Sequence, residues 1–158
     1  MAKFKMGVDV NAASDIIVAR LTQDGTKANH LVDDDKGKFV SLTADSEYAL
    51  SAVEAQIEGC VVAIEPATQD GYTIGSVKTD DRMVAICDGL QATPGTGTIV
   101  LGDYVVVGTP VAAGTALTVT GPKVCKATTQ TVQFFAWRVI SLGVAGAVGD
   151  TCVIERVC

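Results

Sequence analysis

The chain has 158 residues, of which 48% are hydrophobic and 19% are charged, and its 18 acidic and 12 basic residues give a formal net charge of -6. A chain of this length suits one domain and buries roughly 70% of the surface that its unfolded form exposes. The acidic balance argues against binding to nucleic-acid phosphates, and no apolar run reaches the roughly 20 residues that cross a bilayer. A surface so poor in charge favours an oligomer or a partner over a free monomer.

The N-terminal segment, residues 1–38, is more polar than the rest and predicts an extended arm with an edge strand near Ile16 and Ile17. Its first residues, MAKFKMGVDV, lack the apolar stretch of a secretory signal, so we expect synthesis in a cytosol. The acidic run DDDKGK could attract a cation, but it lacks the alternating ligands of a calcium loop and is interpreted as a solvated turn.

A domain over residues 39–158 follows, and it opens with a short strand at 39–42 and a helix at about 44–58. Thr43 can cap this helix, and Leu50, Val53 and Ile57 recur at helical spacing. Gly59 stands where such a helix would stop.

After Gly59 the chain consists of short β-branched runs separated by Gly, Asp or Pro, a pattern typical of a barrel or sandwich. The predicted fold is therefore mainly β, a compact barrel or sandwich of about eight short strands with one α-helix and an extended N-terminal arm. The runs span 60–66, 72–77, 82–89, 98–108, 116–121, 124–129, 131–143 and 150–158.

The same short motif, a Gly-Asp pair directly before a strand expected to be buried, occurs twice in this part of the chain. The pairs are Gly102-Asp103 and Gly149-Asp150. A catalytic interpretation would make the two aspartates an acid and a base, whereas a structural one makes them a repeated turn. Because Gly permits the turn and Asp can accept its backbone N–H groups, we expect one corner used twice.

The aromatic residues gather in QFFAWRV, where alternation places Trp137 and Arg138 on opposite faces of one strand. Trp and Arg are enriched at interface hot spots, but Trp137 could equally fill the core with Arg138 at its rim. The candidate interface residues are Phe4, Ile16, Ile17, Trp137 and Arg138.

The five cysteines are widely spaced, and one histidine, His30, accompanies them, so the ligand pairs of a structural zinc site are missing. Their apolar neighbours indicate small buried side chains kept reduced. No phosphate-binding loop or nucleophile elbow is present, and we expect no catalytic residue, metal or cofactor.

The sequence from Ile57 to Val157 resembles that of the head-decoration or capsid cement proteins of tailed phages in the order of its short motifs. These motifs include Gly102-Asp103-Tyr104-Val105 and AGAVGD at 145–150. The predicted helix at about 44–58 departs from that pattern. The resemblance implies a virion protein without catalysis that binds the major capsid protein on the outside of the assembled shell, commonly as a trimer, and stabilises the shell. The acidic balance and the lack of a long apolar run separately predict no nucleic-acid and no membrane partner.

Two alternatives remain open at this point. One is a tail-tube or other β-sandwich protein of the virion. The other is a small β-barrel enzyme or ligand-binding module that uses the DDDKGK acids with His30 or a cysteine.

Overall fold

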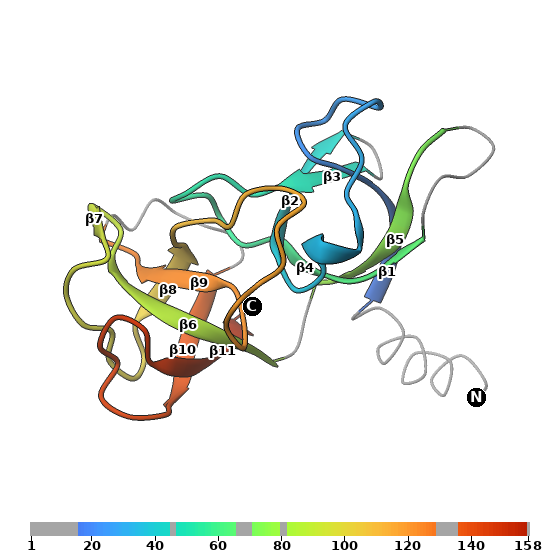
Figure 1. Cartoon of the computed structure of the whole chain (residues 1–158). Coiled ribbons are helices and arrows are strands. Elements are labelled where there is room, and N and C mark those ends of the chain that lie inside the picture. The colour runs from blue at the N-terminus through green and yellow to red at the C-terminus, as the bar shows by residue number, and fades with distance from the viewer. Residues whose placement is uncertain (1–15, 45–46, 66–70, 80–81, 129–135, 158) are drawn as a thin grey trace, which may run out of the picture.

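The structure is a computed structural model that describes residues 16–44, 47–65, 71–79, 82–128 and 136–157. It is mainly β, as expected, but the strands form two units in tandem rather than one barrel (Figure 1). Eleven strands lie within the described residues, where about eight were predicted. In the same residues, no helix has the length and apolar character needed to cross a membrane.

The first unit is a closed barrel with the strand order β1-β3-β2-β4-β5. Its pairs are antiparallel except for β1 with β3, which run parallel. Inside lies a core of Ala19, Leu21, Leu31, Val40, Tyr48, Val61, Ile64 and Val77. The strands are β1 (Ile16–Thr22), β2 (Phe39–Ala44), β3 (Glu47–Leu50), β4 (Gly59–Glu65) and β5 (Ile74–Lys78).

The second unit, called here the second sheet, has the order β11-β10-β8-β9-β6-β7, and β11 also pairs with β6. Most of its core residues come from its own strands, but Phe39 and Ile57 enter the same cluster from the first unit. The strands are β6 (Arg82–Leu90), β7 (Thr93–Pro94), β8 (Tyr104–Val107), β9 (Lys123–Lys126), β10 (Ala136–Leu142) and β11 (Thr151–Val157).

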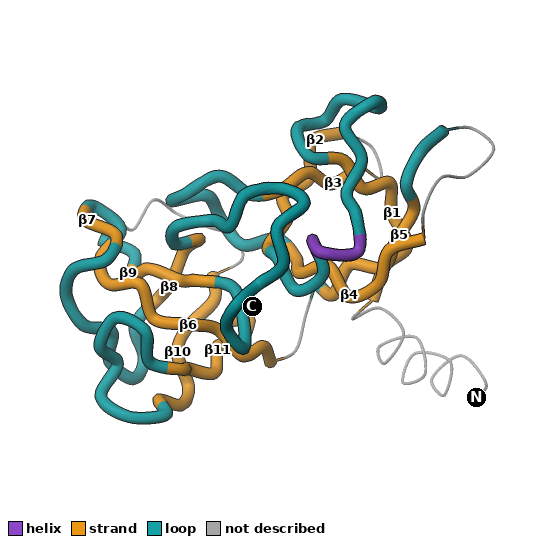
Figure 2. Tube along the Cα trace, viewed as in Figure 1, coloured by secondary structure: helices purple, strands orange, loops and turns teal. Residues whose placement is uncertain are grey.

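Backbone hydrogen bonds also join the units. Val107 of β8 exchanges hydrogen bonds with the segment that leaves β3: Glu54 N–H donates to Val107 O at 2.8 Å, and Val107 N–H donates to Ala55 O at 2.9 Å. Glu54 adopts a positive φ of 66° at this point. The long loop 109–122, drawn between β8 and β9 in Figure 2, was expected to hold a strand at 116–121 and holds none.

The predicted helix at about 44–58 is wrong for the described residues 47–58. Glu47–Leu50 form β3, which lies between β1 and β2, and residues 51–58 run without regular structure to the second sheet. The three apolar residues at helical spacing do not share one face. Leu50 packs against the core of the first barrel, Ile57 enters the core of the second sheet, and Val53 is exposed. Partners distant in sequence thus override helical spacing.

The expected N-terminal arm is not seen in the part of residues 1–38 that the structure describes. β1 is not an edge strand, since it pairs with β5 along one side and with β3 at its end. Leu21 and Leu31 are buried in the first core. Residues 1–15, with Phe4, lie outside the described residues.

Within the described residues, the one short helical element is the 3-10 helix η1 (Asp33–Asp35), which falls in the acidic run. It is the purple segment of Figure 2 and sits at the side of the first barrel that faces the loop 109–122.

Candidate functional site

The first Gly-Asp pair forms a tight corner before β8. Val100 N–H donates to Asp103 Oδ2 at 2.8 Å, and Asp103 N–H donates to Val100 O at 3.1 Å. Gly102 has a φ of 86°, a left-handed conformation that glycine adopts without steric cost. The second carboxylate oxygen of Asp103 pairs with Lys126 Nζ at 2.9 Å.

The second pair forms the same corner before β11. Ala147 N–H donates to Asp150 Oδ2 at 3.0 Å, and Asp150 N–H donates to Ala147 O at 3.0 Å. Gly149 has a φ of 93°, and Ala145 N–H adds a third hydrogen bond to the carboxylate of Asp150 at 3.1 Å. Both aspartates therefore serve their own turns and do not form an acid-base pair.

The two corners lie side by side at one end of the second sheet. Thr98 and Ala147 form an antiparallel bridge, and Ile99 N–H donates to Gly146 O at 2.9 Å. We call residues 98–103 and 143–150 together the corner tip. Its exposed apolar side chains are Val100, Leu101, Val144 and Val148.

Trp137 and Arg138 occupy opposite faces of β10. Trp137 is 1% exposed in the second core, and its indole N–H donates to Ile57 O at 3.0 Å. Of the two predicted roles, Trp137 therefore has that of a core residue, and its ring is not available to a partner. Arg138 is exposed, and its Nη2 lies 3.9 Å from Oε2 of Glu155.

Ile16 and Ile17 begin β1 and point to different surroundings. Ile16 is 46% exposed, while Ile17 packs against the first core. Ile17 also lines a solvent-open hollow at the end of the first barrel nearest β11. Burial raises the pKa of Tyr48 there, and the charge of Glu58 adds to the shift. The other lining residues are Leu42, Gln56, Ile57, Thr79 and Arg156.

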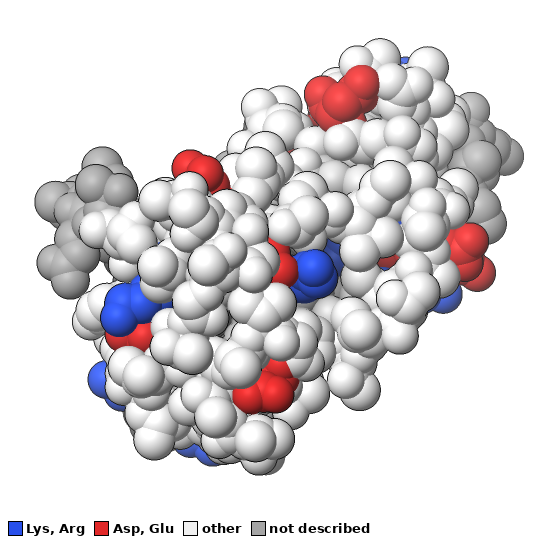
Figure 3. All heavy atoms as spheres, turned by 60° about the vertical axis from the view of Figure 1, so that its left-hand side comes forward, with Lys and Arg blue, Asp and Glu red and all other residues white. Residues whose placement is uncertain are grey.

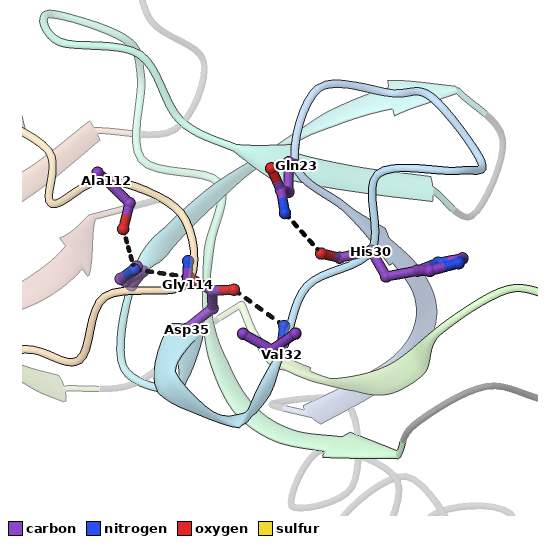
Figure 4. A network of polar contacts seen from close by, with 7 residues as sticks. Gln23, His30, Val32, Asp35, Ala112 and Gly114 are labelled. Carbon is purple, nitrogen blue, oxygen red and sulfur yellow. Dashed lines mark hydrogen bonds and ion pairs between the residues drawn. The ribbon is translucent and has the colours of Figure 1, made fainter.

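A buried ion pair connects the two units (Figure 4). Asp35, at the end of η1, is 0% exposed, and its Oδ1 accepts from Lys38 Nζ at 2.6 Å and from Gly114 N–H at 2.8 Å. Its Oδ2 accepts from Val32 N–H at 2.9 Å. Lys38 Nζ also donates to Ala112 O at 2.7 Å, so the pair attaches the loop 109–122 to the first barrel.

The acidic run contains a second aspartate-lysine pair with the same spacing. Lys36 Nζ lies 3.1 Å from Asp33 Oδ1, but these side chains are 45% and 75% exposed. Both pairs follow i,i+3 spacing in DDDKGK, so the sequence does not distinguish the solvated pair from the buried one.

Asp88 in β6 is a second buried carboxylate. Its Oδ2 accepts from Thr109 N–H at 2.7 Å, and its Oδ1 lies 3.1 Å from Lys123 Nζ. Burial by itself raises the pKa of Asp88, but the hydrogen bonds from Thr109 and the ammonium of Lys123 outweigh it, and the pKa is lowered.

The described cysteines are free and poorly suited to nucleophilic chemistry. Cys87, Cys125 and Cys152 are buried, and Cys60 is half-buried. Burial raises the pKa of Cys60 to about 12 and that of Cys125 to about 11, and it raises the pKa values of Cys87 and Cys152 as well. A thiolate is the reactive form, so these shifts suppress reactivity.

His30 does not join the acidic run into a site. Its ring points away from Asp35 (Figure 4), and its backbone carbonyl accepts a hydrogen bond from Gln23 Nε2 at 2.9 Å. Among the described residues, no group of three or more His, Cys, Asp or Glu side chains is arranged to hold a metal ion.

Comparison with known protein families, with curated proteins and with solved structures finds no match to this chain.

Proposed function

We propose that this protein is a virion structural protein that binds the outside of an assembled phage capsid and stabilises it, as a decoration or cement protein. Its partner would be the major capsid protein, and it would act as a homotrimer without a catalytic step or a cofactor. It would be made in the host cytoplasm and reside on the outer surface of the virion. The order of short sequence motifs from Ile57 to Val157, which resembles that of capsid cement proteins, supports this role.

The observation that carries the proposal is a surface with few charges and many exposed apolar side chains. The face in Figure 3 is mostly uncharged, with isolated acidic and basic groups. Exposed apolar residues occur on both units, among them Val18 and Val62 in the first barrel and Val84 and Leu101 in the second sheet. A surface with few charges and many exposed apolar side chains favours association with a partner over a free monomer.

Two further features support a structural role over a catalytic one. The carboxylates that could have formed an acid-base pair accept backbone hydrogen bonds in their own turns. The buried ion pair of Asp35 and Lys38 and the bonds of Val107 join the units into one body, which suits a protein that stiffens a shell. On a shell with many equivalent positions, repeated placement raises the effective affinity of modest individual contacts.

Co-sedimentation with expanded capsids of the phage that encodes the chain tests the proposal. We expect binding that saturates at a fixed number of copies for each shell and a higher melting temperature of the decorated shell. Absence of binding to those shells would overturn the proposal. Rings or tubes formed by the purified protein, seen by electron microscopy, would favour the tail-tube alternative.

A further inference from the structure

The hollow at the end of the first barrel, called here the barrel-end hollow, brings together polar side chains from both units. Tyr48 of β3 and Glu58, directly before β4, line it from the first unit, and Arg156 of β11 lines it from the second sheet. These residues are distant in the sequence and meet where β11 approaches the end of the barrel. A few polar groups that converge on one cavity are typical of a ligand site.

Two of these groups have unused hydrogen-bonding capacity. Tyr48 is 8% exposed and belongs to the first core, yet its hydroxyl has no hydrogen-bond partner among the described residues. Oε2 of Glu58 accepts from Leu42 N–H, whereas Oε1 has no partner in the same part of the chain. Because the core encloses the rest of the Tyr48 side chain, a partner for its hydroxyl must come from the hollow.

Charges of opposite sign act on the Tyr48 hydroxyl. Burial is the main cause that raises the pKa of Tyr48, the charge of Glu58 raises it further, and the charge of Arg156 lowers it. Nη1 of Arg156 donates to Thr79 O at 2.6 Å, which holds the guanidinium at the wall of the hollow. A ligand complementary to this arrangement carries an ammonium group for Glu58 and a carboxylate for Arg156 and Tyr48.

The remaining wall of the hollow is largely apolar. It is formed by Ile17, Leu42 and Ile57, together with the side chain of Gln56. An aliphatic group of a ligand would remove this wall from water, which a purely polar ligand would not do. An α-amino acid with an aliphatic side chain carries the ammonium group, the carboxylate and the apolar group on one carbon atom.

We propose that the barrel-end hollow binds a free aliphatic α-amino acid. Glu58 accepts from the ammonium group of the ligand, and Tyr48 and Arg156 donate to its carboxylate. The aliphatic side chain lies against Ile17 and Leu42. This binding makes and breaks no covalent bond, and it is independent of attachment to a capsid.

Isothermal titration calorimetry of the full chain with L-leucine tests the site. We expect saturable, equimolar binding, with a dissociation constant raised about 10-fold or more in Tyr48→Phe and in Glu58→Gln, because each change removes a hydrogen bond to a charged group. Tyr104→Phe makes the same change as Tyr48→Phe at an exposed tyrosine of β8. It is the matched control and should bind leucine as the wild type does.

Analogues of leucine test the class of ligand. N-acetyl-L-leucine lacks the ammonium group and L-leucinamide lacks the carboxylate, so each should bind about 10-fold more weakly or worse. Glycine keeps both charges but lacks the aliphatic group, and it should also bind more weakly than leucine. An analogue without one of the two charges that binds as tightly as leucine would show that the proposed ligand class is wrong.

Thermal unfolding separates loss of the site from loss of the fold. Tyr48→Phe removes a hydroxyl that has no protein partner, so the ligand-free variant should melt no lower than the wild type, whereas leucine should raise its melting temperature less. Absence of saturable binding by the wild type at millimolar leucine would overturn the proposal. Unchanged leucine binding in both Tyr48→Phe and Glu58→Gln would overturn it as well.

Discussion

The buried pair of Asp35 and Lys38 and the exposed pair of Asp33 and Lys36 provide an internal comparison. Lys38→Met keeps most of the apolar side chain but removes the ammonium that lies 2.6 Å from Asp35 Oδ1. Lys36→Met makes the same change two residues earlier, where the ion pair is exposed to water. The two variants thus differ in burial and in the contacts of the lysine, not in the chemistry of the substitution.

The expected magnitudes are well separated. Removing one partner of a buried ion pair leaves an uncompensated charge and costs about 3–5 kcal/mol. Lys38→Met also removes the hydrogen bond to Ala112 O, worth about 1 kcal/mol, so we expect a total loss of about 5 kcal/mol. Lys36→Met should cost no more than about 1 kcal/mol, since solvent screens exposed pairs.

Urea unfolding, followed by tryptophan fluorescence, measures both free energies of unfolding. Hydrogen exchange adds a local measurement, because Gly114 N–H donates to Asp35 and should exchange faster in Lys38→Met. The double variant Asp35→Leu/Lys38→Met should lose less stability than the sum of its single changes, since it leaves no lone buried charge. Equal losses in Lys36→Met and Lys38→Met would refute the assignment of the buried pair as the link between the units.

Three further outcomes follow from the corners, the buried carboxylate and the thiols. Gly149→Ala should cost about 1 kcal/mol of unfolding free energy, because the positive φ of Gly149 is the only obstacle to a side chain there. Gly146→Ala should lower the melting temperature more than Gly149→Ala does, because its new β-carbon would overlap the Ile99 carbonyl oxygen. Similar melting temperatures of the two variants would contradict this. The folded-state pKa of Asp88 is lowered, so its contribution to stability is complete above its unfolded pKa and is lost as pH falls through the folded value. Asp88→Asn should therefore lose less free energy of unfolding than the wild type between about pH 5 and about pH 3, and parallel pH profiles would argue against it. Burial raises the pKa of Cys125 to about 11, so the unfolded chain releases this proton first and stability should fall as pH rises above about 9. Cys125→Ala should reduce that fall by at most about 1.4 kcal/mol for each pH unit, and an unchanged alkaline profile would speak against the shift.

The mainly β character could be predicted because it depends on residues close together in the chain. Short β-branched runs with Gly, Asp or Pro between them favour strands wherever they occur. The corners likewise depend on residues at most five positions apart, so the chemistry of Gly102-Asp103 and Gly149-Asp150 is visible in the sequence.

The prediction failed where distant partners decide the structure. Leu50, Val53 and Ile57 have helical spacing, but two separate cores and the solvent divide them, and Glu47–Leu50 become a strand between β1 and β2. The division into two units was missed for the same reason, because no composition shift or linker separates β5 from β6.

The sequence by itself determined the strand-rich character, the low surface charge and the turn chemistry, since each depends on composition or on neighbours in the chain. Only the tertiary structure decided that Asp35 and Lys38 are buried while Asp33 and Lys36 remain in water. The spacing of the two pairs is identical, and their difference arises from the loop 109–122, which covers one pair and donates Gly114 N–H to it. Burial depends on what a distant segment covers, and local sequence carries no information about that segment.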